Sequence, residues 1–295
     1  MKIAIVGGSG FIGTHTARAM QQSGYDITVI DKCQPSIDVN YVRVDILDHD
    51  KCLQYIKGFD YVYHLAAISD ADENRKDPIG SIAVNIQGLT NVLNSCVSNN
   101  IQRVIFSSSV WVYSAANVVD VDEETSLDIN KVNHIYTASK LAGEALIRSF
   151  TNLYGLDHTI LRYGIAYGPG QTAPTAIVQF MNNAINKEPM IIYGDGSYHR
   201  NFMYVTDHAR GNICALKDAA KNQTINLEGP EPITINRVAN TISNQFGSVE
   251  IKRKPARSGD YTGKIVCNEK SKALINWSPT VSFNEGIQLY KHELV

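Results

Sequence analysis

Short apolar runs alternate with amphipathic stretches through the first half of the chain. The runs are rich in Val, Ile and Tyr, and they are continuously apolar instead of alternating with polar residues. Strands of this kind are typical of a parallel sheet that helices cover on both faces. The predicted strands are residues 3–6, 27–30, 41–44, 61–64 and 104–106.

Two further stretches repeat apolar residues at intervals of three and four, which places them on one face of a helix. Strands that alternate with helices indicate βαβ units with right-handed crossovers. The sequence therefore predicts an α/β fold with a Rossmann-type, doubly wound parallel sheet. The two stripes are Ile82, Ile86, Leu89, Leu93 and Cys96, and Ala142, Leu146, Phe150 and Leu153.

The second half is richer in turn residues, such as those of 167–170 and 192–197. We expect residues 1–165 to form the larger domain, with segments near 201–229 returning to it. Residues 166–200 and 230–295 would then form a smaller, loop-rich domain. Helices are expected at 174–186, 206–219, 234–246 and 269–275.

Composition narrows the protein class. Of the 295 residues 44% are hydrophobic and 19% charged, as in globular proteins. Lys+Arg 27 against Asp+Glu 29 gives a net charge of -2, which offers no attraction to nucleic acid or anionic lipid. No run approaches the roughly 18 apolar residues of a membrane span, and no signal peptide is visible, so a cytoplasmic location is the default expectation. The five cysteines are scattered, with no metal-binding or disulfide pattern.

A glycine-rich loop, Gly7-Gly8-Ser9-Gly10-Phe11-Ile12-Gly13, follows the first strand directly. Gly7 would permit the tight turn, Gly10 the approach of a pyrophosphate and Gly13 close packing of helix on sheet. The following helix would present free N–H groups and the positive end of its dipole to the phosphates. The loop therefore predicts a dinucleotide site.

Asp31, at the end of the second strand, lies 18 residues beyond Gly13. A carboxylate there can accept hydrogen bonds from the adenosine ribose. It would repel a 2′-phosphate, and Lys32 is the only adjacent cation, so NAD is favoured over NADP.

Tyr136 and Lys140 lie four residues apart, on one face of a predicted helix. A free phenol has a pKa of about 10 and is a poor base at neutral pH. A nearby ammonium group and an oxidised nicotinamide ring would both favour the phenolate. The pair is therefore a candidate for taking a proton from a sugar hydroxyl while hydride leaves the same carbon.

Together these features resemble the extended short-chain dehydrogenase/reductase family, specifically its NAD-dependent nucleotide-sugar epimerases and dehydratases. The resemblance spans essentially the whole chain. Besides the glycine loop and the Tyr136/Lys140 pair, it is carried by Asp45-Ile46, His64-Leu65-Ala66-Ala67, Asn85, Ser107-Ser108-Ser109-x-x-Val112-Tyr113, Leu161-Arg162-Tyr163, Tyr167-Gly168-Pro169-Gly170, Gly194-Asp195-Gly196-Ser197 and Arg257-Ser258-Gly259-Asp260.

The resemblance implies roles for these residues. Tyr136 would be the base, Lys140 would bind the nicotinamide ribose, and Ser109 would hydrogen-bond the reacting oxygen. Residues 1–165 would bind NAD, and the smaller domain the substrate. Ser107 and Ser108 are also explained as polar residues that satisfy backbone groups at a strand end. The implied cofactor contacts are Gly7, Gly10, Phe11, Ile12, Gly13, Asp31, Lys32, Asp45, Ile46, Leu65, Ala66, Ala67, Asn85, Ser107, Ser108 and Tyr163, with Tyr136 and Lys140.

Three departures from the family pattern bear on the reaction. Dehydratases carry an Asp-Glu pair directly after the Ser/Thr, whereas this chain has Val110-Trp111, which cannot transfer protons in that way. Ile165 replaces an Asn that contacts the diphosphate in epimerases. His134 precedes Tyr136 in a stretch where Pro is usual; it is either a substrate contact or, the reading we favour, an exposed loop residue.

On the substrate side, Arg200 and Arg257 match positions that meet the nucleotide diphosphate, and Asp260 one that meets the ribose or sugar. Guanidinium groups suit phosphate oxygens because two N–H groups align with two oxygens. Tyr193 would pack on the base or serve as a core or interface residue. Relatives dimerise through helices equivalent to 80–98 and 136–153; the exposed faces here read as mixed polar, and we expect a homodimer.

The sequence thus predicts an NAD-dependent epimerase that acts at C4 of a UDP-sugar through a transient 4-keto intermediate. The main alternative is a dehydrogenase or ketoreductase of nucleotide sugars; a 4,6-dehydratase and a non-catalytic NAD-binding sensor are disfavoured. No metal is expected.

Overall fold

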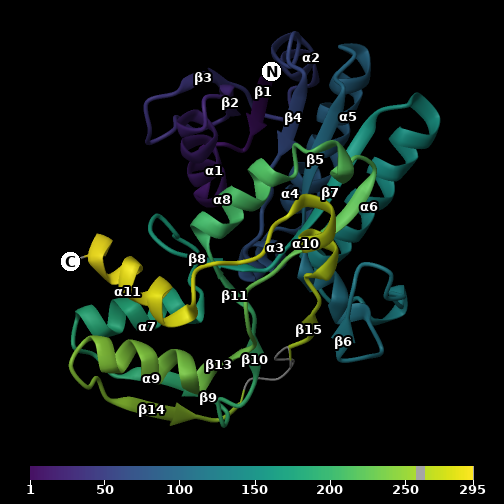
Figure 1. The fold of residues 1–295 in the computed structure, drawn as a ribbon. Helices are drawn as coiled ribbons and strands as arrows, with labels where there is room; N and C mark the ends of the chain where they lie inside the picture. The colour runs from purple at the N-terminus through teal and green to yellow at the C-terminus, as the bar shows by residue number, and fades with distance from the viewer. Residues whose placement is uncertain (257–262, 295) are drawn as a thin grey trace.

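The computed structural model describes residues 1–256 and 263–294. A seven-stranded parallel sheet lies at the centre of the larger part of the molecule (Figure 1), so the predicted Rossmann-type α/β fold is confirmed. Its strand order is β12-β7-β5-β4-β1-β2-β3. The strands are β1 (Lys2–Val6), β2 (Asp26–Asp31), β3 (Asn40–Arg43), β4 (Tyr61–His64), β5 (Arg103–Ser109), β7 (Asp157–Tyr163) and β12 (Gln223–Leu227).

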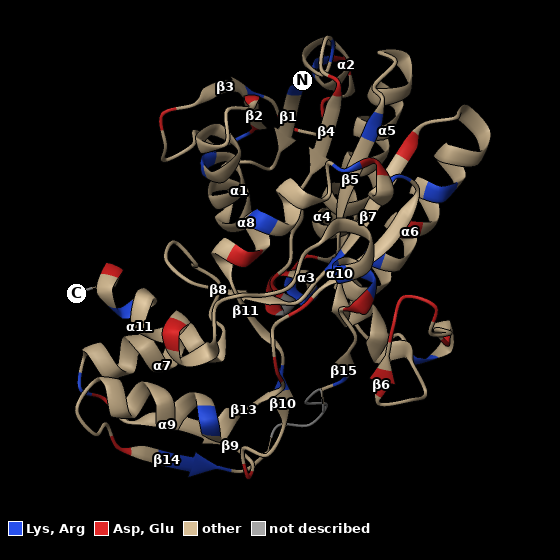
Figure 2. Cartoon of the chain, in the orientation of Figure 1, with Lys and Arg blue, Asp and Glu red and all other residues tan. Residues whose placement is uncertain are grey.

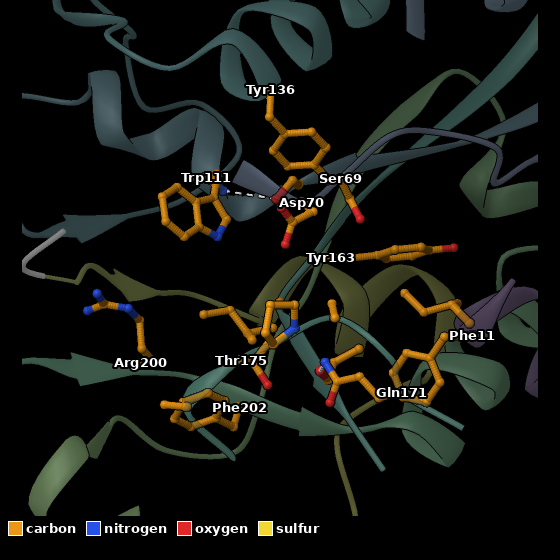
Figure 3. Close-up of a pocket in the computed structure, with 18 of the residues that line it drawn as sticks. Phe11, Ser69, Asp70, Trp111, Tyr136, Tyr163, Gln171, Thr175, Arg200 and Phe202 are labelled. Atoms are coloured by element: carbon orange, nitrogen blue, oxygen red, sulfur yellow. Dashed lines mark hydrogen bonds between the residues drawn. The ribbon is translucent and has the colours of Figure 1, made fainter. Parts of the chain in front are cut away.

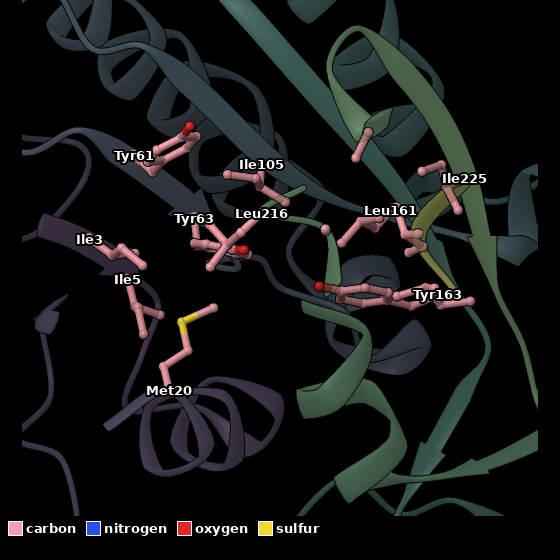
Figure 4. Packing of buried hydrophobic residues seen from close by; sticks show 14 of the residues in the cluster. Ile3, Ile5, Met20, Tyr61, Tyr63, Ile105, Leu161, Tyr163, Leu216 and Ile225 are labelled. Carbon is pink, nitrogen blue, oxygen red and sulfur yellow. The ribbon is translucent and has the colours of Figure 1, made fainter. Parts of the chain in front are cut away.

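The sheet carries a separate apolar core on each face, because side chains alternate along a strand. Ile3 and Ile5 of β1 pack with Met20 on one face, as Figure 4 shows, and Ala4 and Val6 pack into the other. Helices α1 (Phe11–Gln22) and α8 (Val205–Cys214) cover the first face; α2 (His49–Tyr55), α5 (Leu89–Ser98) and α6 (Ile135–Tyr154) cover the second.

The predicted helix over the first apolar stripe is divided into segments. The chain runs through α3 (Ala71–Lys76) and α4 (Pro78–Ile82) into a π-helical turn (Ala83–Gly88) and then α5. Ile46 packs against this turn so closely that a Cβ on Gly88 would lie 2.4 Å from its Cδ1. Leu89, Leu93 and Cys96 are buried as expected, but Ile82 is exposed.

The second stripe faces the protein's own core only in part, because Leu146 and Phe150 pack against that core and the other two residues do not. Helix α6 forms, yet its buried side consists of residues such as Lys140, Glu144 and Ile147. Ala142 is exposed, and Leu153 is 72% exposed. The exposed positions of α6 combine Leu153 and Tyr154 with Arg148, Ser149 and Asn152, so this face is the mixed polar surface expected from the sequence.

Helix α8 ends at Cys214, five residues before the predicted end at 219. The chain turns there so that the carbonyls of Ala215, Leu216 and Lys217 accept hydrogen bonds from the buried Arg103 guanidinium, at 2.9–3.4 Å. The other three helices predicted in the second half are confirmed to within two residues as α7 (Ala176–Ile185), α9 (Ile235–Gln245) and α10 (Glu269–Ile275).

A smaller part of the molecule is built from paired short strands and helices around a third core. Figure 2 shows that its strand β14 carries consecutive basic residues. The domain division at 165 stays a prediction; Trp277, which it assigns to the smaller domain, packs in the core of the large sheet. The remaining elements are β6 (Asp120–Val121), β8 (Ile165–Tyr167), β9 (Met190–Tyr193), β10 (His199–Arg200), β11 (Phe202–Tyr204), β13 (Ile233–Thr234), β14 (Ile251–Lys254), β15 (Ile265–Val266), α11 (Phe283–Leu294) and 3₁₀ turns at Val110–Ala115, Ile129–Lys131 and Asp218–Ala220.

None of the helices in the described ranges is both long and apolar enough to cross a membrane.

Candidate active site

The glycine loop makes its tight turn between β1 and α1. Gly7 has φ +83°, and a Cβ there would lie 2.4 Å from the backbone N of Ala66. A Cβ on Gly13 would lie 2.3 Å from the Gly7 carbonyl oxygen, whereas one on Gly10 would meet only that oxygen, at 3.4 Å. Packing therefore requires glycine at positions 7 and 13, and the space beside Gly10 stays open.

Asp31 ties the glycine loop to the end of β2. Its carboxylate accepts hydrogen bonds from the backbone N–H groups of Ser9 and Cys33, both at 3.0 Å. Lys32 is exposed beside it. Further along the same edge of the sheet, Asp45 is exposed and caps the turn at Leu47, and Ile46 is buried. These four residues lie outside the lining of the large cavity described below.

The side chain of Asn85 forms its hydrogen bonds with other groups of the protein. Its amide bonds the backbone of Ile68 twice, at 2.8 and 3.0 Å, and donates to the Ser139 hydroxyl. Since residue 68 lies in the loop after β4, Asn85 fixes the segment that carries Leu65 and Ala67 into the cavity. The geometry therefore gives Asn85 a positioning role.

The three serines at the end of β5 point in different directions. The Ser107 hydroxyl donates to the His64 carbonyl at 3.1 Å, and that of Ser108 donates to buried Glu144 at 2.6 Å. The Ser109 hydroxyl accepts the Trp111 N–H at 3.2 Å and lies within reach of the Tyr136 phenol. Of the three hydroxyls, the one on Ser109 is placed beside the predicted base.

Tyr136 and Lys140 lie side by side on the first turns of α6, with the ammonium nitrogen 5.6 Å from the phenol ring centre. The Lys140 ammonium donates to the Ser107 carbonyl at 2.6 Å. Burial raises the pKa of Tyr136 to about 12, against the effect of the Ser109 hydrogen bond, and lowers the pKa of Lys140 to about 7. The expected lowering of the phenol pKa by the ammonium group is therefore not found in the protein alone.

Beneath these residues lies a buried network that sequence reasoning missed. Arg162 donates to both carboxylate oxygens of Glu144 at 2.9 Å and to the Tyr113 hydroxyl at 2.9 Å. Burial alone would raise the pKa of Glu144, but the hydrogen bonds and charge of Arg162 hold it below its usual range. The network joins β5, α6 and β7, and so fixes Ser108 and the turn that carries Lys140.

A cavity of about 660 Å³ connects the two parts of the molecule. Figure 3 shows Phe11 at one side and Arg200 at the other, with Tyr136 above the space between them. The predicted residues that line it are Gly7, Gly10, Phe11, Ile12, Gly13, Leu65, Ala67, Ser107, Ser108, Ser109, Tyr136, Lys140, Tyr163, Tyr193 and Arg200. Ala66 packs behind the glycine loop, and Arg257 and Asp260 lie outside the described residues.

Several residues of the cavity wall carried no clear sequence signal. His134 is half-buried against the ring of Trp111, at 5.8 Å between centres, so the reading as an exposed loop residue was wrong. Ile165 lines the wall as an apolar residue. Ser69, Asp70 and the segment 171–176 also contribute, and they come from loops whose course depends on distant contacts.

The residues present fit NAD. The glycine loop leaves open space at Gly10, and no side chain in the described chain caps the first turn of α1, so its N–H groups can receive phosphate oxygens. The cavity continues from this loop to Tyr163, whose hydroxyl donates to Asn212 and so leaves the ring edge along the wall. A dinucleotide that begins at the loop thus has a continuous path to Tyr136 and Lys140.

Known proteins are similar over the full length of the chain. Residues 3–227 match the NAD dependent epimerase/dehydratase family. A UDP-glucuronate 4-epimerase of Thermodesulfobacterium geofontis is 27% identical, covering 96% of this chain and 93% of its own. A decarboxylase of Bacillus cytotoxicus and a dTDP-glucose 4,6-dehydratase of Streptomyces niveus are also among the relatives.

Solved structures give the same picture. UDP-glucose 4-epimerase of Thermotoga maritima, solved with UDP-glucose, has a TM-score of 0.91 at 26% identity, with 100% of this chain and 98% of that chain covered. A UDP-glucuronic acid 4-epimerase of Bacillus cereus, solved with NAD, has a TM-score of 0.91 at 27% identity and covers 100% of both chains. The chain therefore belongs to the NAD-dependent epimerase/dehydratase family of enzymes, and its cofactor is NAD.

Proposed function

We propose that this protein is an epimerase that inverts C4 of a UDP-sugar through a transient 4-keto intermediate. The observation that carries the proposal is the wall beside the catalytic hydroxyls. Directly after Ser109 the chain has Val110, which is buried, and Trp111, which lines the cavity, where a dehydratase of this family has two acids. Ser109, Tyr136 and Lys140, together with NAD, are sufficient for a reaction that moves one hydroxyl proton and one hydride.

The chain's own residues divide the work. Tyr136 takes the proton of the reacting hydroxyl and returns it, and Ser109 holds the same oxygen by a hydrogen bond. Lys140 supports the phenolate from the next turn of α6. Bound NAD supplies a reversible hydride acceptor, and the positive charge of its oxidised ring favours the phenolate that burial otherwise disfavours.

The assignments of the other site residues stay proposals. Asp31 would meet the adenosine ribose, with Lys32, Asp45 and Ile46 around the adenine. Arg200, on the wall opposite the glycine loop, would meet the diphosphate of the substrate. Tyr193 lines the same part of the cavity, where it can pack on the base.

A 4,6-dehydratase is the second candidate, because the structure places one acid, Asp70, in the cavity. Dehydration requires both an acid for the leaving hydroxyl and a base for the neighbouring carbon. Asp70 could supply one of these, and the Val110-Trp111 pair supplies neither.

We also propose that the protein is a homodimer that pairs through α5 and α6. The C-terminal end of α6 exposes two large side chains, Leu153 and Tyr154, at 72% and 59%. Large side chains that are exposed together on a helix are suited to a helix–helix contact between two copies of the chain.

The purified protein, incubated with UDP-, dTDP-, GDP- and CDP-sugars without added cofactor, tests the reaction by mass-resolved chromatography. A new peak of unchanged mass supports the epimerase. A product lighter by one water identifies the dehydratase, and conversion only after NAD or NADH is added identifies a dehydrogenase or reductase.

A further inference from the structure

The loop after β4 places one carboxylate in the cavity at a fixed position. Asp70 caps α3, where its Oδ1 accepts the Glu73 N–H at 2.8 Å. The loop itself is held by two amides: Asn85 bonds the backbone of Ile68 on both sides, and Asn74 donates to the carbonyls of Ile68 and Asp70 at 3.1 and 2.7 Å. The carboxylate therefore cannot easily leave the wall.

Asp70 lies on the part of the wall that a sugar would face. Figure 3 shows its carboxylate below Tyr136, with Arg200 further along the cavity, and Trp111 lines the same cavity. In the proposed function the reacting carbon lies at Tyr136 and the diphosphate at Arg200. The sugar ring spans the distance between them, so its remaining substituents meet this stretch of wall.

Among the described residues, Asp70 is the one acid that lines the cavity. The cationic side chains in the described lining are those of Lys140 and Arg200. The Lys140 ammonium is buried and donates to the Ser107 carbonyl. His134, on the same stretch, has its pKa lowered by burial, so it adds no charge at neutral pH. Asp70 is thus the one negative charge on the described part of this wall, where it faces aromatic and neutral groups and the buried Lys140 ammonium.

We propose that Asp70 selects the sugar: the site accepts a nucleotide sugar with neutral or amino substituents and rejects one with a carboxylate, such as a hexuronate. This inference rests on the proposed function. A second carboxylate in the same cavity is repelled by Asp70, whereas a hydroxyl or amine can donate a hydrogen bond to it. Like charges that face each other in this way are a strong source of discrimination.

The consequence separates this chain from part of its family. Epimerisation or decarboxylation of a uronic acid would require the substrate carboxylate to lie in this cavity. With Asp70 in place, both reactions are disfavoured, although a uronate epimerase and a decarboxylase are among the relatives.

The test compares UDP-glucose with UDP-glucuronate, which differ only in whether C6 is a hydroxymethyl or a carboxylate. Binding to the NAD-loaded protein is measured by calorimetry, and kcat/KM by chromatography. The variant is Asp70→Asn, because asparagine also caps helices and leaves α3 intact. The matched control is Asp77→Asn, which changes the cap of α4, where Asp77 accepts the Gly80 N–H at 2.9 Å outside the cavity.

The wild type and Asp77→Asn should bind UDP-glucose at least about tenfold more tightly than UDP-glucuronate, and Asp70→Asn should narrow that ratio by about tenfold. An unchanged ratio in Asp70→Asn, or a wild type that prefers UDP-glucuronate, would overturn the inference. Selective binding without epimerisation would refute the proposed function and support the selectivity of Asp70. Epimerisation without selectivity would support the proposed function and refute the role of Asp70. If neither sugar binds, both proposals fail.

Discussion

Arg162 donates two hydrogen bonds of 2.9 Å to the carboxylate of Glu144, and the side chains of both residues are almost fully buried. Glu144 lies one helical turn after Lys140 on α6. The pair of Arg162 and Glu144 links the end of β7 to α6, the helix that carries the proposed catalytic residues Tyr136 and Lys140. Because Glu144 also accepts the Ser108 hydroxyl, one buried ion pair fixes the end of β5 relative to the first turns of α6, on both sides of the proposed reaction centre.

Loss of this ion pair should destabilise the whole fold. Arg162→Met leaves a buried carboxylate without its main partner, and we expect the free energy of unfolding to fall by about 3–5 kcal/mol. Urea denaturation followed by circular dichroism measures it. The control is Arg148→Met, since Arg148 bonds the same carboxylate at 3.1 Å but is 45% exposed, and its loss should amount to less than about 1 kcal/mol. Equal losses in the two variants would contradict this account.

The buried carboxyl of Glu228 should make the stability of the protein fall as pH rises. Burial raises its pKa well above the usual range, against the Gly229 N–H that it accepts at 2.9 Å. The folded state therefore holds this proton more tightly than the unfolded state, so stability falls as pH rises above the carboxyl's ordinary pKa. We expect Glu228→Gln to raise the free energy of unfolding by at least about 1 kcal/mol at pH 8, with the gain shrinking toward pH 5.

Glu231 supplies the control with the opposite sign. Its hydrogen bond to Arg237 lowers its pKa, so its contribution is present above the ordinary pKa of the carboxyl and disappears as pH falls. Because the pair is exposed, Glu231→Gln should cost less than about 1 kcal/mol at neutral pH. Thermal unfolding curves of both variants at several pH values decide the matter. If Glu228→Gln instead destabilises the protein at pH 8, ionisation of the buried Glu228 carboxyl does not lower the stability of the wild type at that pH, and the prediction fails.

The exposed side chains of Leu153 and Tyr154 at the end of α6 are the basis of the proposed dimer. Leu153→Lys puts a charge into the proposed interface and should shift the dimer to monomer in sedimentation velocity runs at micromolar concentration. Leu289→Lys is the matched control, because Leu289 is 41% exposed on α11, away from α6. A wild type that sediments as a monomer, or a Leu153→Lys variant that stays dimeric, would refute the interface.

Much of the fold follows from local pattern. Continuous apolar runs identified five strands of the sheet, and Gly7 and Gly13 occupy positions where packing admits no side chain. The α6 stripe shows the limit of periodicity: it locates a helix, but it cannot say whether the apolar face meets the protein's own core or another chain. Leu153 is exposed, whereas Leu146 and Phe150 of the same stripe pack against the core.

The sequence predicted those site residues whose spacing within one helix indicates their chemistry, as for Tyr136 and Lys140. It did not predict the site residues whose contacts are to partners distant in sequence. Glu144 and Arg162 become neighbours only when α6 packs on β7. Asp70 lies in the cavity on a loop that the distant Asn85 helps to hold. Such contacts depend on the tertiary fold and leave no pattern in a single sequence.

Removal of the phenol oxygen should abolish turnover without disturbing the structure. We expect Tyr136→Phe to lower kcat by about 10³-fold or more, with NAD content and unfolding temperature close to those of the wild type. Tyr154→Phe, on the exposed end of the same helix, should keep full activity. A fully active Tyr136→Phe protein would exclude Tyr136 as the base.

The most direct test of the proposed reaction follows a hydrogen atom. The NAD-loaded protein is incubated in ordinary water with a UDP-sugar that carries deuterium at C4, and the product is analysed by mass spectrometry and nuclear magnetic resonance. Epimerisation through a transient 4-keto sugar predicts a C4 epimer that keeps its deuterium at C4, because the hydride leaves and returns to the same carbon. Loss of the label to solvent or to free cofactor, or a product of different mass, would contradict it.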